Sequence, residues 1–105
     1  MTNPTKQMSP VDSAWLHMEE STNLMMITGV MVFGAPVDLN RLRTTIERRL
    51  LPIDRFRQRV VQPRRPCAAP HWEEDPSFDL DNHLVRIALA PPADRAVLQD
   101  VASEL

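Results

Sequence analysis

Apolar side chains recur along the 105-residue chain at spacings of three and four, which predicts three amphipathic helices. The first is expected over residues 9–20, where Ser9 can cap the helix and Pro10 suits its first turn. The second is expected over 38–50 and the third over 94–105. Their apolar stripes are Val11, Ala14, Trp15 and Met18, then Leu39, Leu42, Ile46 and Leu50, then Val97, Leu98, Val101 and Leu105.

Four other segments predict β-strands. Residues 25–33 are apolar on both alternating faces, which is typical of a strand buried on both sides. Residues 55–61 alternate with three arginines on one face, 71–74 form a short strand, and 83–89 alternate again. The resulting order, α-β-α-β-β-β-α, indicates an α/β fold with a mixed (α+β) sheet.

The two ends of the chain differ in character. Residues 1–8 are polar and without periodicity, and we expect a disordered start there. Residues 9–105 then form one domain. The last helix ends without a glycine or a basic residue, as either a natural C-terminus that frays or a chain cut inside or just after a helix would.

Composition narrows the function classes. Twelve Lys and Arg against 14 Asp and Glu give a net charge of −2, which argues against nucleic acid as a partner. No apolar run approaches the roughly 20 residues that span a bilayer, and the single cysteine favours a reducing, cytoplasmic compartment. Ten prolines, two glycines and 5% aromatic residues predict a thin core, which raises the question of whether the chain is a whole folding unit.

The three histidines show no pattern that predicts a metal site. His17 is expected at the surface, and His83 is expected to be buried on an apolar strand face. His71 and Asp75 match the His-x-x-x-Asp spacing of a catalytic histidine base. Two features count against that role, because no second histidine precedes His71 and Pro76 stands where that motif has glycine.

One basic cluster and one thiol complete the candidate chemistry. Arg55, Arg57 and Arg59 could contact an anion such as a nucleotide-like ligand. Alternatively they form a solvated strand face that pairs with the acidic residues 73–75. Cys67 has no neighbouring base in the sequence and is interpreted as an incidental thiol.

Five segments, taken in order, resemble the amino-terminal region of the bacterial wax ester synthase/diacylglycerol acyltransferase family. They are Met8-Ser9-Pro10-Val11-Asp12, Trp15-Leu16-His17-Met18-Glu19, Arg55-Phe56-Arg57-Gln58-Arg59, Pro70-His71-Trp72-Glu73-Glu74-Asp75-Pro76 and Phe78-Asp79-Leu80-Asp81-Asn82-His83. The similarity runs from about Met8 to Leu105 and so covers nearly the whole chain.

The resemblance implies a fold. Enzymes of this family are several times longer and are similar to chloramphenicol acetyltransferase, with two α/β halves facing each other across a channel. Their diagnostic His-His-x-x-x-Asp-Gly motif follows the helix that here begins near Asp94, and it is absent from this sequence. The chain is therefore expected to be the first part of such a half-domain, with no catalytic residue of its own. Trp15 and Met18 are candidates for lining the substrate channel.

The resemblance also implies an activity for the whole enzyme. A fatty acyl group would pass from acyl-CoA, a co-substrate rather than a bound cofactor, to a long-chain alcohol or diacylglycerol, with a histidine as general base. The expected partners are the remaining C-terminal part of the enzyme and a hydroxyl acceptor lipid, with association at the inner membrane surface or lipid inclusions. The segment alone is expected to be inactive. Alternatives are a stand-alone acyl-chain-binding or interaction module, and part of a condensation-type enzyme.

Overall fold

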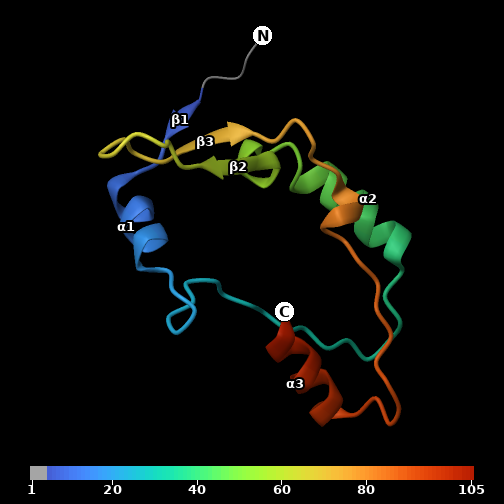
Figure 1. Ribbon diagram of the computed structural model, residues 1–105. Helices are drawn as coiled ribbons and strands as arrows, with labels where there is room; N and C mark the ends of the chain where they lie inside the picture. The colour runs from blue at the N-terminus through green and yellow to red at the C-terminus, as the bar shows by residue number, and fades with distance from the viewer. Residues whose placement is uncertain (1–4) are drawn as a thin grey trace.

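The computed structural model describes residues 5–105, which form an open ring with a small antiparallel sheet on one side and α3 on the opposite side (Figure 1). In chain order the elements are β1 (Lys6–Gln7), α1 (Pro10–Met18), α2 (Leu39–Arg49), the 3₁₀ helix η1 (Asp54–Arg57), β2 (Gln58–Val61), β3 (His71–Glu74), the 3₁₀ helix η2 (Leu80–Asn82) and α3 (Arg95–Glu104). The expected combination of helices and strands in an α/β fold is confirmed.

All three predicted helices are confirmed, and each begins at a side-chain cap. Ser9, Asp38 and Asp94 accept hydrogen bonds of 3.0–3.1 Å from backbone N–H groups in the first turn of α1, α2 and α3. These bonds satisfy donors that have no partner within the helix. Local chemistry therefore fixes where each helix begins.

The sheet has the order β1-β3-β2, with both pairs antiparallel. The predicted strand at His71–Glu74 is confirmed as the central strand β3, and Val60 lies opposite Trp72 in the register of β2 with β3. β2 begins at Gln58, so the prediction of a strand from residue 55 is wrong for its first three residues. Because β3 is four residues long and lies between two prolines, it offers β2 only four partners.

The expectation of a disordered start is corrected for residues 5–8. Lys6 and Gln7 pair with β3, and the Met8 N–H donates a 2.9 Å hydrogen bond to the Pro70 carbonyl. Met8 is only 5% exposed, so it anchors the start of the chain. Residues 1–4 lie outside the described residues.

Two predicted strands are absent from the described sheet. Residues 25–33 run as unpaired chain (Figure 1), and so do residues 84–89. His83 belongs to the end of η2, where its N–H donates to the Leu80 carbonyl at 2.9 Å. A strand needs a neighbour to receive its backbone hydrogen bonds, and no other segment within residues 5–105 supplies one.

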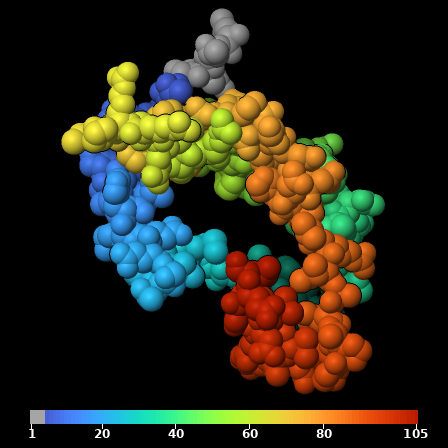
Figure 2. All heavy atoms as spheres, viewed as in Figure 1, coloured from blue at the N-terminus to red at the C-terminus, as the bar shows by residue number. Residues whose placement is uncertain are grey.

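The elements surround an open centre that side chains do not fill (Figure 2). Met8 and Leu80 are the buried hydrophobic residues of the described chain. The radius of gyration is 17.5 Å, against about 13 Å for a compact chain of this length. The accessible surface is 9423 Å², against about 6,000 Å² for a globular protein of this mass. The described residues thus form an open frame, the elements around this centre, that is held by local contacts.

Replacing the cap of α2 tests how far local chemistry holds this frame. Asp38→Ala removes the acceptor for two backbone N–H groups and should cost about 1 kcal/mol of helix stability. We expect lower helicity by circular dichroism and faster amide exchange over α2. Asp38→Asn keeps a capping oxygen and serves as the control. Equal loss in both variants would show that the cap is not the cause.

Candidate functional site

Arg57 joins three parts of the chain at one corner of the sheet. Its Nε donates to the Leu51 carbonyl at 2.8 Å, and its Nη2 donates to Asp54 Oδ1 at 2.9 Å. Its Nη1 also pairs with Glu74 on β3. The side chain is 28% exposed, and all three guanidinium nitrogens are engaged within the protein. Arg57 therefore acts as a clamp between η1 and β3.

Arg59 pairs across the ladder with the residue directly opposite. Its Nε and Nη2 lie 2.9 Å and 2.6 Å from Glu73 Oε1. The hydrogen bond that Arg59 donates to Glu73 raises the pKa of Arg59 above its ordinary value. His71 Nε2 lies 3.7 Å from the other oxygen of Glu73. This carboxylate therefore lies between two basic groups on neighbouring strands.

Arg55 makes a third kind of contact. Its guanidinium carbon lies 3.8 Å from the centre of the Trp72 ring, a cation–π geometry. The Trp72 Nε1 is buried and has no hydrogen-bond partner among the described residues. Arg55 and Arg57 belong to η1 rather than to β2, so the prediction that Arg55, Arg57 and Arg59 share one strand face is wrong. Their proposed contact with an anion stays a prediction.

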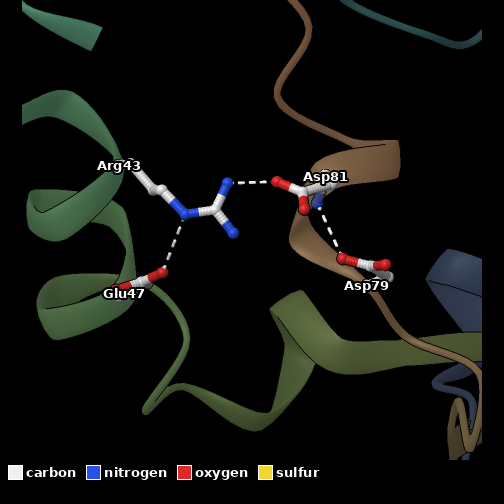
Figure 3. A network of polar contacts seen from close by, with 4 residues as sticks. All are labelled: Arg43, Glu47, Asp79 and Asp81. Carbon is white, nitrogen blue, oxygen red and sulfur yellow. Dashed lines mark hydrogen bonds and ion pairs between the residues drawn. The ribbon is translucent and has the colours of Figure 1, made fainter. Parts of the chain in front are cut away.

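A second charged network links α2 to η2 (Figure 3). Arg43 Nε donates to Glu47 Oε1 at 3.1 Å within α2, and Arg43 Nη1 pairs with Asp81. The Asp81 N–H in turn donates to Asp79 Oδ1 at 2.9 Å. The hydrogen bond to Asp81 raises the pKa of Arg43. The network fixes η2 beside α2.

Trp15 and Met18, the channel-lining candidates, lie three residues apart on α1. Each is 53% exposed, so the structure leaves both side chains accessible to a partner or substrate. Their role in a channel stays a prediction.

Two of the histidines make local contacts. His17 Nδ1 lies 2.6 Å from the Ser13 carbonyl, one turn earlier on α1, and its exposed position is as expected. His83 stacks on Phe78 with ring centres 5.1 Å apart and is exposed. The expectation of a buried His83 is therefore wrong, because the segment after η2 has no sheet to cover it.

The His-x-x-x-Asp spacing does not assemble a catalytic pair. His71 lies within β3, whereas Asp75 Oδ1 accepts a 2.9 Å hydrogen bond from the Ser77 N–H and caps the following turn. Cys67 is exposed in the loop between β2 and β3 with a left-handed φ of 69°. Within residues 5–105 no group of His, Cys, Asp and Glu side chains is arranged to hold a metal ion.

An apolar groove of about 660 Å³ lies beside α3. Its apolar lining comes from both unpaired segments and the helix: Val30, Val32, Leu89, Leu98 and Ala102. Polar atoms enter it from α3 through Asp94, Arg95 and Gln99. None of the three histidines lines this groove. The sequence did not predict this groove. It predicted two of the segments that line it, 25–33 and 83–89, as strands and indicated no neighbouring strand for either.

Comparison with known proteins places the chain in a class of lipid acyltransferases. Residues 8–105 match the family model described as the wax ester synthase/diacylglycerol acyltransferase catalytic domain. The chain belongs to this wax ester synthase/diacylglycerol acyltransferase family, and the resemblance noted in its sequence is confirmed.

Three relatives from Mycobacterium tuberculosis strain H37Rv illustrate the match. Rv2484c, named as a diacylglycerol O-acyltransferase, is 36% identical over 100 residues, covering 91% of this chain and 20% of that protein. Tgs1 and tgs3, with the same kind of name, are 29% and 28% identical over 93% and 94% of this chain. These alignments cover 22% of tgs1 and 38% of tgs3. The chain thus spans about a fifth of the length of the first relatives that it matches.

No solved structure is significantly similar to the chain. Among residues 5–105, each helix is too short or too polar to cross a bilayer.

Arg57 of η1 and Arg59 of β2 give a matched test of the clamp. Arg57→Met removes three hydrogen bonds, two of them to carboxylates. Because the side chain is partly exposed, we expect a loss of about 1–2 kcal/mol in the free energy of unfolding. Arg59→Met removes only the solvent-exposed pair with Glu73 and should cost less. The amide exchange rates of β2 and β3 measure the loss of stability in both variants. A larger effect at Arg59 would contradict the assignment of Arg57 as the clamp.

Proposed function

We propose that the chain is the N-terminal part of an enzyme that transfers a fatty acyl group from acyl-CoA to a hydroxyl acceptor. The acceptor is a long-chain alcohol or diacylglycerol, so that the product is a wax ester or triacylglycerol. The family match over residues 8–105 supports the reaction class. The names of the mycobacterial relatives support diacylglycerol as one acceptor.

The observation that carries the proposal is the open frame. Eighteen large apolar side chains of the described residues are exposed, while Met8 and Leu80 are the buried hydrophobic ones. Exposed apolar surface on this scale marks a site of interaction. Relatives that are about five times longer offer the material to cover it. A stand-alone acyl-binding module is less well supported, because it would need a closed pocket and a core of its own.

The catalytic base is proposed to come from the remainder of the enzyme. The three histidines of this chain are engaged by a helix carbonyl, a carboxylate and a phenyl ring, and none lines the groove. In the proposed reaction, a histidine removes the acceptor's hydroxyl proton as its oxygen attacks the thioester carbonyl. The new C–O bond forms, the C–S bond breaks, and coenzyme A leaves as the thiol with that proton.

The role of this chain is then to build one wall of the substrate site. Acyl-CoA serves as a co-substrate, and no bound cofactor is required. Trp15 and Met18 are proposed to line the path of the acyl chain, since both are apolar, adjacent on α1 and accessible. We further propose that the enzyme works in the cytoplasm, at the inner membrane surface or on lipid inclusions, where its lipid acceptor gathers.

A chimera tests the proposed activity. Residues 8–105 replace the matching part of Rv2484c, and ester formation from labelled palmitoyl-CoA is followed with hexadecanol or dioleoylglycerol as acceptor. We expect the chimera to retain activity within about tenfold of unaltered Rv2484c, and the 105-residue chain alone to form no ester. A folded chimera without activity, or ester formation by the chain alone, would contradict the proposal.

A further inference from the structure

Residues 24–33 have the composition of a central strand but no strand beside them. Val30 and Val32 on one face are 54% and 81% exposed, and Met31 and Phe33 on the other are 80% and 63% exposed. None of the backbone hydrogen bonds found among residues 5–105 involves this segment. Apolar side chains on both faces and unpaired backbone groups on both edges are typical of a central strand whose neighbouring strands are absent from the described residues.

Residues 85–89 also have unpaired backbone groups, and they are apolar on one alternating face. Val85 and Ile87 are 67% and 58% exposed, and none of the backbone hydrogen bonds between described residues involves residues 85–89. Leu89, on the same alternating face, lines the groove together with Val30 and Val32. Both unpaired segments therefore border one groove, with α3 as its third side.

We propose that this groove receives a β-strand from the remaining part of the enzyme. The strand pairs with the backbone of 24–33 and 85–89 and rests its apolar face on Leu98 and Ala102 of α3. This inference rests on the proposed function only for the source of the strand.

The chemistry of the groove selects a strand over other occupants. A covered backbone N–H or C=O without a partner is unfavourable, so whatever covers these segments must hydrogen-bond to them. An extended peptide does so along its whole length, whereas a helix or a lipid chain does not. The apolar lining further requires that the strand be apolar on the side toward α3.

The length of the relatives indicates where the strand comes from. The match with Rv2484c covers 91% of this chain but 20% of that protein, so most of the relative has no counterpart here. Within residues 5–105, the strands that form already pair with one another in a separate sheet. The incoming strand is therefore assigned to the unmatched four-fifths.

Proline substitution tests strand pairing directly. Successive N–H groups of an extended chain point to opposite edges, so Met31→Pro and Val32→Pro each remove a donor from a different edge. Neither N–H donates to another described residue, so the chain itself loses no hydrogen bond. Met31→Ala and Val32→Ala shorten the side chains but keep the donors, and they serve as matched controls.

The probe is the part of Rv2484c that follows the matched region, produced as a separate chain. We expect it to bind the 105-residue chain and to slow amide exchange at residues 25–33 and 85–89 at least a hundredfold. At least one proline variant should weaken binding tenfold more than its alanine control. Failure to bind, protection confined to other residues, or proline variants that match their controls would each overturn the proposal. Equal protection at high concentration of the chain alone would assign the groove to a second copy instead.

The activity of the chimera separates this inference from the proposed function. A chimera that forms ester while residues 25–33 exchange freely would overturn strand addition and leave the function standing. A chimera that protects these amides but forms no ester would overturn the function and leave strand addition standing.

Discussion

Apolar surface that the chain cannot cover by itself is the constraint on which the rest of the structure depends. An unfolded chain of this mass exposes about 17,400 Å², and a self-contained domain of this size hides roughly 60–65% of that. The accessible surface here is 9423 Å², so only about half is hidden. The frame in Figures 1 and 2 is what remains when local contacts form and the central core does not.

What does form is held by short-range chemistry. Capping aspartates and a serine start the helices, two prolines limit β3, and arginine clamps join neighbouring elements. The caps involve residues close in sequence, whereas the two arginine pairs, Arg57 with Glu74 and Arg43 with Asp81, join residues 17 and 38 positions apart. Arg57 and Arg59, two of the arginines that suggested an anion site, thus pair with carboxylates of β3 at the sheet corner. A different arginine, Arg43, links α2 to η2.

The helices and β3 could be predicted from sequence because caps, apolar spacing and prolines act locally. The strand at Lys6–Gln7 could not, since two polar residues carry no periodic signal and their pairing depends on β3. The segments 25–33 and 83–89 were predicted as strands from side-chain pattern alone, yet a ladder needs a partner that residues 5–105 do not supply. Trp15 and Met18 could be singled out from the sequence because they are apolar residues on one helix. The groove could not be predicted, because it depends on α3 approaching both unpaired segments.

Calorimetry of the isolated 105-residue chain tests the central claim most directly. A self-contained domain of this length absorbs about 70 kcal/mol in one cooperative transition near 60 °C. With its apolar surface uncovered, the chain should show a broad, weak transition or none, with an enthalpy far below that value. A single sharp peak of full size, with equal calorimetric and van't Hoff enthalpies, would contradict the account.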